Sequence, residues 1–161
     1  MENTSKFLCV PMNIDHAESI CSWRYPQPYH IYNWQNWLDM KATGYEFADP
    51  QIRAEQYAAV LDQHQELIGF TQFFPMLGVT RLGFGLHPDR CGSGNGASFA
   101  RAIAKEAVRR IPSNNIDLEV LTWNLRAFHA YQKAGFVHTD TYERPTPTGI
   151  QAFHCMVYSL K

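Results

Sequence analysis

Hydrophobic and polar positions follow two different periods along this chain. Short runs rich in β-branched and aromatic residues predict strands over residues 6–12, 57–61, 67–74, 82–86, 116–121, 136–142 and 150–160. Apolar residues three or four positions apart predict helices over about 14–23, over 97–111 and after Asn124, and residues 29–40 form a further helix or irregular turn. We therefore expect a mixed α/β (α+β) fold, with a mostly antiparallel seven-stranded sheet flanked by about four helices.

Capping and breaking residues mark where these elements end. Asn13 or Asp15 can cap the first helix, and Pro112 ends the long helix that begins near residue 97. Glycine, proline and polar residues predict loops over residues 44–50 and 145–149.

Length and charge limit the classes of function. The 161 residues, 45% of them hydrophobic and 18% charged, predict a single globular domain. A net charge of −1 gives no general attraction to nucleic acid, and no apolar run approaches the roughly 18 residues that a membrane span requires. The cysteines and histidines lack metal-ligand spacing, so we expect no metal site. The cysteines also show no C-x-x-C pair, so we expect free thiols and a location in the reducing cytoplasm.

A glycine-rich loop precedes the long helix and carries the first candidate chemistry. It reads Cys91-Gly92-Ser93-Gly94-Asn95-Gly96. Backbone amides at such a loop and at a helix start can bind a pyrophosphate. A nucleotide-hydrolysing P-loop would end in Gly-Lys-Ser/Thr, whereas Gly96 is followed by Ala97 and Ser98. The dinucleotide pattern G-x-G-x-x-A also fits and stays open, although residues 87–90 separate it from the strand.

A second motif follows at the spacing of one helix. Asn124, Ala127, Tyr131, Gly135 and Phe136 match the pattern Asn-x-x-Ala-x-x-x-Tyr-x-x-x-Gly-Phe. With the glycine loop upstream, the chain from about residue 56 onward resembles the GNAT superfamily of N-acetyltransferases. Residues 1–55 fit that family only by their strand–helix–helix pattern. Where the family loop usually has Arg or Gln, this chain has Cys91, with Arg90 beside it.

The resemblance implies acetyl-CoA as cofactor and a domain over residues 1–161, with an acceptor-side part (1–55), an acetyl-CoA-binding core (56–142) and a C-terminal strand (143–161). The implied cofactor-binding residues are a strand end, the loop and two residues of the second motif: Phe84, Gly85, Leu86, Cys91, Gly92, Ser93, Gly94, Asn95, Gly96, Ala97, Asn124 and Tyr131. The Leu86 N–H would polarise the acetyl carbonyl.

Two residues are the candidate catalysts that the resemblance implies. Tyr131 would donate a proton to the leaving thiolate, although it could instead be a core aromatic residue. Glu119 lies five residues before Asn124, where a branch of the family that acetylates N-terminal amines has its base. It could equally belong to a surface salt bridge, and His87 or a water relay are other routes for the proton.

Aromatic residues near the N-terminus are the candidate acceptor site. Trp23, Tyr25, Tyr29 and Tyr32 can line an apolar or cation-accepting pocket, or can be core. Few acidic residues accompany them, Glu18, Asp39 and Glu46 among them, so the sequence does not favour a polyamine or an aminoglycoside.

The predicted activity is acetyl transfer to a primary amine of a small molecule or peptide. The alternatives are a non-catalytic acyl-CoA-binding module and a dinucleotide-binding oxidoreductase. The sequence is compatible with a homodimer formed through the C-terminal strands.

Overall fold

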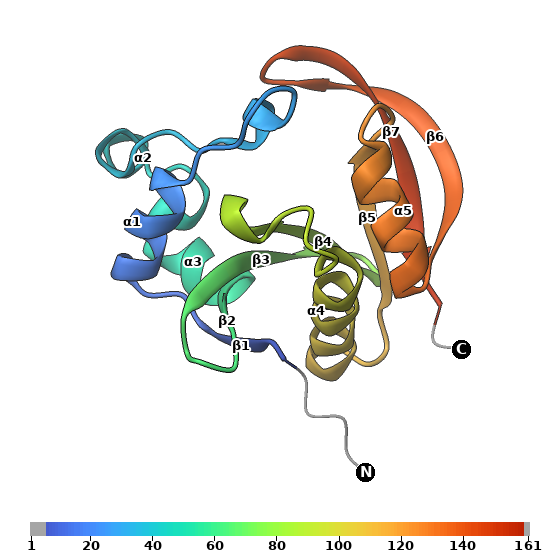
Figure 1. Cartoon of the computed structure of the whole chain (residues 1–161), viewed down its shortest axis with the longest axis horizontal. Helices are drawn as coiled ribbons and strands as arrows, with labels where there is room; N and C mark the ends of the chain where they lie inside the picture. The colour runs from blue at the N-terminus through green and yellow to red at the C-terminus, as the bar shows by residue number, and fades with distance from the viewer. Residues whose placement is uncertain (1–5, 160–161) are drawn as a thin grey trace. The chain divides into compact units, whose positions relative to one another are not determined.

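The computed structural model describes residues 6–159 and is drawn in Figure 1. The chain divides into two compact units. The first comprises the described residues up to Gln72 together with Phe84–Cys91, and the second comprises Phe73–Gly83 and the described chain from Gly92 onward. Strands β3 (Leu67–Met76) and β4 (Val79–Leu86) each run from one unit into the other.

The first unit contains a three-stranded antiparallel arrangement and its helices. Strand β2 (Tyr57–Leu61) pairs with β1 (Leu8–Pro11) on one side and with β3 on the other. The helices are α1 (Ile14–Ser22), α2 (Trp37–Thr43) and α3 (Pro50–Gln56), and three 3₁₀ turns cover Tyr29–Tyr32, Glu46–Ala48 and Pro88–Arg90. As predicted, Asn13 caps α1, and its side chain accepts a hydrogen bond from the His16 N–H at 2.8 Å.

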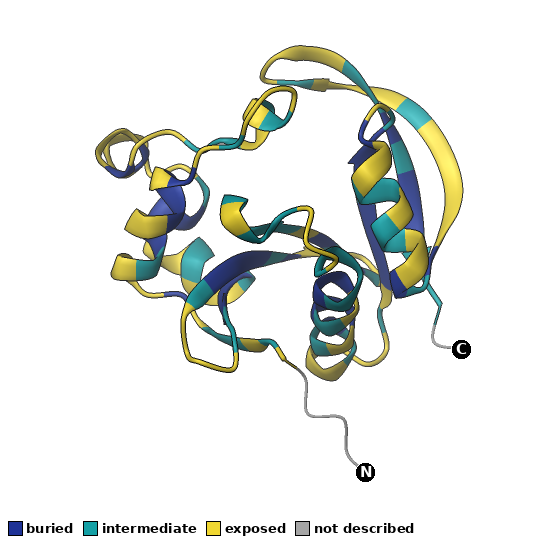
Figure 2. Cartoon of the chain, in the orientation of Figure 1, coloured by how far each residue is buried: buried dark blue, intermediate teal, exposed yellow. Residues whose placement is uncertain are grey.

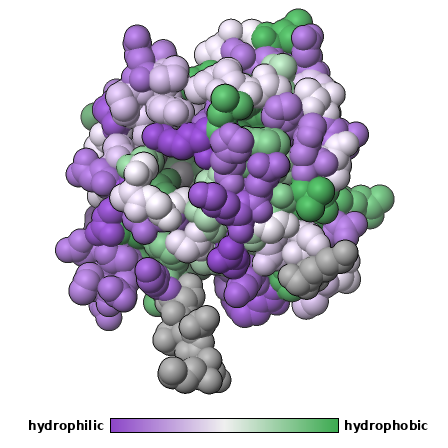
Figure 3. Space-filling view, turned by 45° about the vertical axis from the view of Figure 1, so that its right-hand side comes forward, coloured by the Kyte–Doolittle hydropathy of each residue, from purple (hydrophilic) through white to green (hydrophobic). Residues whose placement is uncertain are grey.

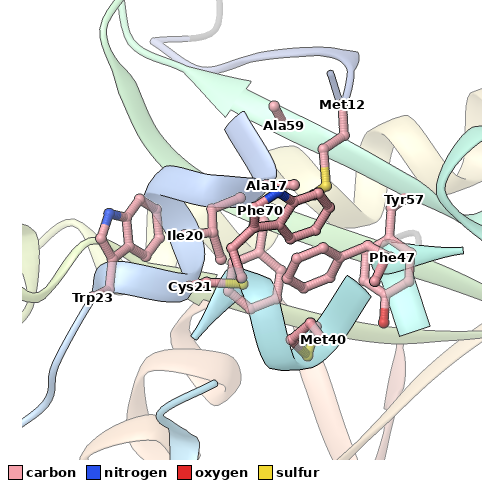
Figure 4. Close-up of a cluster of buried hydrophobic side chains, with 12 residues drawn as sticks. Met12, Ala17, Ile20, Cys21, Trp23, Met40, Phe47, Tyr57, Ala59 and Phe70 are labelled. Carbon is pink, nitrogen blue, oxygen red and sulfur yellow. The ribbon is translucent and has the colours of Figure 1, made fainter. Parts of the chain in front are cut away.

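An aromatic and aliphatic core holds the first unit together (Figure 4). Ile20 of α1, Met40 of α2 and Phe47 of the second 3₁₀ turn are fully buried. The rings of Phe47 and Tyr57 meet edge to face at 5.3 Å, at the opposite end of the cluster from Trp23. Because these side chains come from elements far apart in the sequence, their burial fixes the helices against the sheet.

Helix α3 corrects the prediction of a loop over residues 44–50. The structure has the second 3₁₀ turn there and starts α3 at Pro50. The Asp49 carboxylate accepts hydrogen bonds from the N–H groups of Gln51 at 2.8 Å and Ile52 at 3.2 Å. Proline at the first position of a helix loses no intrahelical hydrogen bond. Asp49-Pro50 is therefore a helix start rather than a loop signal.

The second unit contains the C-terminal part of the sheet. Strand β4 is parallel to β5 (Asn115–Leu121), and β7 (Gly149–Tyr158) pairs antiparallel with β5 and with β6 (Phe136–Thr146). Helix α4 (Gly96–Arg110) packs beside α5 (Leu125–Ala134), as Figure 1 shows. Strand β5 is largely buried and β7 is mostly intermediate in burial, whereas most of β6 is exposed (Figure 2).

Strand β6 carries an irregularity that affects the site. Its register against β7 shifts between His138 and Asp140, so the residue between them is a β-bulge that reverses the alternation of side chains. Beyond the bulge, Thr141 bonds to His154 at 2.8 Å on the face that α5 covers through Phe128. Tyr142 consequently points to the opposite face of the sheet.

The predicted fold class is confirmed. The seven strands form one mostly antiparallel sheet in the order β1-β2-β3-β4-β5-β7-β6, with five α-helices among the described residues rather than about four. Strand β4 begins at Val79 and β6 ends at Thr146, so both are longer than predicted, while Leu160 lies outside the described residues.

None of the helices within residues 6–159 has the length and apolar character to cross a membrane. Hydrophilic side chains dominate the face shown in Figure 3, where hydrophobic ones form separate small patches.

Candidate active site

The glycine loop of the second unit has a backbone that depends on glycine. Gly92 and Gly94 have φ angles of +77° and +82°, a region that side chains with a Cβ rarely adopt. The Asn95 side chain does not cap α4, and its amide nitrogen donates to Ser93 Oγ at 2.9 Å. The loop therefore leads into a fifteen-residue helix whose first N–H groups donate no hydrogen bond to the side chain of this cap residue. A phosphate would find both exposed amides and the positive end of the helix dipole there.

The same loop lies against the helix that carries Tyr131. A Cβ built on Gly96 would lie 3.3 Å from the Ala130 Cβ, closer than most such contacts. Glycine at the start of α4 thus allows the close approach to α5, one residue before Tyr131. The structure therefore brings together, within one unit, the loop and the helix that the two sequence motifs predicted.

Helix α5 is held at both ends by residues of the second motif. The buried Asn124 side chain accepts a hydrogen bond from the Ala127 N–H at 3.2 Å, which satisfies the helix start. Gly135, with a φ of +111°, ends the helix in the left-handed conformation. Tyr131 is half-buried, and its ring lies 6.2 Å from that of Phe136. Both predicted roles of Asn124 remain compatible with this geometry, and the cap role is observed.

Glu119 lies within a network of hydrogen bonds and ion pairs on β5. The Tyr142 hydroxyl donates to its Oε2 at 2.5 Å, and Arg144 Nη2 lies 3.1 Å from Oε1. Arg81 Nη1 lies 3.6 Å from the same Oε1, and only 10% of the Glu119 side chain is exposed. Burial, and then the bond to Glu119, raises the pKa of Tyr142. The carboxylate therefore sits in a largely buried ion-pair network rather than in a surface salt bridge, and a base role for it stays a prediction.

Arg81 makes its shorter ion pair with Asp117 rather than with Glu119. Its Nε and Nη2 donate to the two oxygens of Asp117, each at 3.0 Å, in a bidentate pair. This bond is the main cause that raises the Arg81 pKa further above its usual value. Arg81, Asp117, Glu119 and Arg144 thus form a group of two cations and two anions that balance each other.

The strand end predicted to carry the cofactor arm lies in the first unit. A Cβ on Gly85 would lie only 2.7 Å from Phe70 Cε1 and 3.4 Å from the Tyr25 hydroxyl oxygen. The Tyr25 hydroxyl donates to the Leu86 carbonyl at 2.6 Å. Gly85 is thus required by the packing of the Phe70 ring, which the sequence could not distinguish from close approach by a ligand.

Cys91 replaces the usual Arg or Gln and has its own contacts. Its thiol can donate to the carbonyls of His87 at 3.6 Å and of Leu86 at 3.8 Å. Both carbonyls belong to the end of β4 or the residue after it. The thiol therefore links the start of the loop to the strand end with weak hydrogen bonds.

The four predicted acceptor-binding aromatic residues differ in their surroundings. Trp23 is buried, with its ring 5.0 Å from that of His87 and 6.3 Å from that of Phe70. Burial raises the pKa of Tyr25, which is tied to β4. Tyr29 is half-buried and Tyr32 is 40% exposed, both in the first 3₁₀ turn. Acceptor binding by these four residues remains a prediction.

Several functional candidates were not identified from the sequence. Arg81, Tyr142 and Arg144 surround Glu119, and Glu46 is a partly buried carboxylate in the first unit. For Arg81, Tyr142 and Arg144 the sequence signal was their position within strands, because polar residues two positions apart on a strand share one face. For Glu46 no local signal exists, because its partners lie 11 and 26 residues further along the chain.

Comparisons with known proteins place this chain among acetyltransferases. The family model described as "Acetyltransferase (GNAT) domain" matches residues 7–137. A search of curated proteins finds no match.

Solved structures share the fold at low sequence identity. A Bacillus anthracis acetyltransferase of the GNAT family is 13% identical with a TM-score of 0.76, over 94% of this chain and 93% of that chain. A chimera of the Vibrio cholerae spermidine N-acetyltransferase SpeG and hSSAT is 14% identical with a TM-score of 0.72, over 96% and 95%. The aminoglycoside acetyltransferase AAC(6')-Ib, in complex with coenzyme A, is 19% identical with a TM-score of 0.71, over 94% of each chain.

The family match extends over both units and over most of the chain. It confirms the prediction of an acetyltransferase with acetyl-CoA as its cofactor. The chain belongs to the GNAT family of acetyltransferases.

Proposed function

We propose that this protein transfers the acetyl group of acetyl-CoA directly to a primary amine of a small molecule. The observation that carries the proposal is the glycine loop in front of α4. Gly92 and Gly94 have positive φ angles there, and the side chain of the cap residue Asn95 makes no capping hydrogen bond to the helix. This backbone fits a pyrophosphate, and the family match names the chemistry.

The residues present fit acetyl-CoA in their chemistry. The amides from Gly92 to Ala97 would bind the pyrophosphate, and the backbone of Phe84, Gly85 and Leu86 would bind the pantetheine arm. The bound cofactor supplies an acetyl thioester. Close contact of Gly96 with Ala130 ties the loop to α5 and supports a common role for the loop and Tyr131.

Tyr131 would supply the proton that the departing thiolate takes up. A phenol is a weaker acid than a thiol in water, so donation requires a sulfur that gains charge in a site shielded from water. The half-buried position of Tyr131 supports such a role. For the amine proton, Glu119 is the proposed base, although its oxygens already accept hydrogen bonds from Tyr142 and Arg144.

A small amine rather than a protein is the proposed acceptor. Structures of the same fold include a spermidine N-acetyltransferase and an aminoglycoside acetyltransferase, and this likeness supports the acceptor class.

The first test measures binding and transfer separately. Thermal melting with acetyl-CoA, coenzyme A and NAD should show a shift of several degrees with the two coenzyme A species alone, since a ligand at 100 times its Kd stabilises by about 2.7 kcal/mol. Release of free thiol in the presence of an amine panel then measures transfer. A shift with NAD alone, or with no ligand, would contradict the proposal. Binding without thiol release would support the non-catalytic module instead.

A further inference from the structure

Like Asp49, which caps α3, Glu46 is a partly buried carboxylate of the first unit that has no cation beside it among the described residues. Within residues 6–159, no Lys, Arg or His nitrogen lies within 4.0 Å of its oxygens. In the same unit Asp62 pairs with Arg90 at 3.1 Å. Arg53, seven residues after Glu46, instead donates to the Phe47 carbonyl at 2.9 Å.

Neutral donors hold the Glu46 carboxylate in place. The Tyr57 hydroxyl donates to Oε2 at 2.7 Å, and Gln72 Nε2 lies 3.3 Å from the same oxygen. Gln72 is itself fixed by Gln56, whose Oε1 accepts from Nε2 at 2.8 Å. Burial, followed by the contact with Glu46, raises the pKa of Tyr57, so this phenol stays a donor. The carboxylate is therefore fixed in position while its negative charge remains uncompensated.

The backbone also fixes this residue. Glu46 has a φ of +49°, which is uncommon for a residue with a side chain. Its neighbour Phe47 is fully buried and packs edge to face on the rings of Tyr57 and Trp34, at 5.3 and 4.8 Å. The neighbour on the other side, Tyr45, is 47% exposed. Glu46 lies between the buried Phe47 and the exposed Tyr45 and is itself partly exposed to solvent.

Strand β3 places this carboxylate on the same face of the sheet as Gly85. Gln72 and Phe70 are two residues apart on β3, so their side chains share a face and lie roughly 7 Å apart. The Phe70 ring covers Gly85, within the strand end proposed to bind the pantetheine arm. Glu46, held by Gln72, therefore lies on the same face of the sheet as the strand end that is proposed to bind the pantetheine arm.

We propose that Glu46 binds a second ammonium group of the acceptor, so that the acceptor is a polycationic amine such as a polyamine or an amino sugar. This inference rests on the proposed acetyl transfer to a small amine. An ammonium group bound beside Glu46 would donate charge-assisted hydrogen bonds to its carboxylate, which otherwise accepts only from neutral groups. The aromatic rings of Trp34 and Tyr45, 6.3 Å apart, lie along the same segment and suit the methylene or ring carbons of such an acceptor.

The test compares acceptors that differ by one ammonium group. Putrescine and n-butylamine have the same carbon chain, and only putrescine carries a second amine. For the intact protein we expect kcat/KM to favour putrescine by about tenfold or more, the range of one charge-assisted hydrogen bond. Glu46→Gln keeps an oxygen for the Tyr57 hydroxyl but removes the charge. It should reduce the preference to about twofold, through KM for putrescine, and leave KM for acetyl-CoA unchanged.

A matched control removes a carboxylate elsewhere in the same unit. Glu55 is exposed on α3 and accepts a hydrogen bond from Gln51 at 3.1 Å. Glu55→Gln should leave the putrescine preference at its original value. An equal preference in the intact protein and in Glu46→Gln would overturn the inference while leaving acetyl transfer intact. If no amine raises the release of thiol above the rate measured without amine, both the inference and the proposed function fail.

Discussion

The two units of the chain hold their candidate residues by different interactions. In the second unit Glu119 is matched by Arg81 and Arg144 and by the hydroxyl of Tyr142. In the first unit Glu46 is held only by neutral groups. A carboxylate that is already neutralised contributes to folding, whereas one held without a cation can be neutralised by a ligand. Substitutions in the second unit should therefore change stability and turnover, and those around Glu46 should change the choice of acceptor.

The largest effect should follow from the hydroxyl of Tyr131. If the chemistry belongs to the second unit, Tyr131→Phe should lower kcat by about 100-fold or more, the typical contribution of a general acid, and leave the Kd for acetyl-CoA within about twofold. Tyr158→Phe is the matched control, because its ring lies on the same Phe136 at 5.2 Å. Steady-state kinetics and calorimetric titration measure the two quantities. A Tyr131→Phe variant with unchanged kcat would remove the acid assignment.

The second prediction compares how much the carboxylates of Glu119 and Glu46 each contribute to the free energy of unfolding. Glu119→Gln leaves the Arg144 guanidinium without its anion, removes one of the two carboxylates beside Arg81, which keeps Asp117, and should lower the free energy of unfolding by about 2 kcal/mol. Glu46→Gln leaves no cation unpaired and should cost less than about 1 kcal/mol. Urea unfolding of both variants measures the difference. Equal losses would show that the two sites are held alike.

The smallest expected effect concerns Gly85, where packing and ligand approach compete as explanations. Gly85→Ala brings a Cβ to 2.7 Å from the Phe70 ring and should destabilise by about 1–2 kcal/mol through overpacking. In a Phe70→Leu background the same change should cost less, because the ring atoms are gone. Thermal or urea unfolding measures the pair of values. An alanine that weakens acetyl-CoA binding without any loss of stability would favour close approach of the ligand instead.

Local patterns predicted most of the fold, because the signals that decide a strand or helix lie within it. Asn13 and Gly135 were correctly placed at helix ends, since caps act over a few residues. The missed helix α3 had its own local signal, Asp49 followed by Pro50, which had been interpreted as a loop. That error came from treating proline only as a helix breaker.

The candidate site was less accessible to sequence reasoning, because its contacts are long-range. Acceptor binding by Tyr25 stays a prediction, and no local pattern indicates that its hydroxyl donates to the Leu86 carbonyl, 61 residues away. The partners of Glu119 on β6 lie 23 and 25 residues beyond it. A pattern of residue types does not determine which strand will lie opposite another or which face will meet it. The glycine loop was predictable because its backbone conformation is set by its own residues.

The bulge in β6, rather than the identity of any side chain, decides which residues of that strand meet Glu119. Because the register shifts between His138 and Asp140, Tyr142 and Arg144 point toward Glu119 and Thr141 points toward His154. Deleting the single residue Thr139 would remove the bulge and leave Thr141 opposite His154, so the two faces of the strand would stay as they are. A strand that kept Thr139 but paired regularly would instead exchange the two faces beyond this point. The bulge therefore lets a homologous chain gain or lose one residue here and still surround the same glutamate with the same groups.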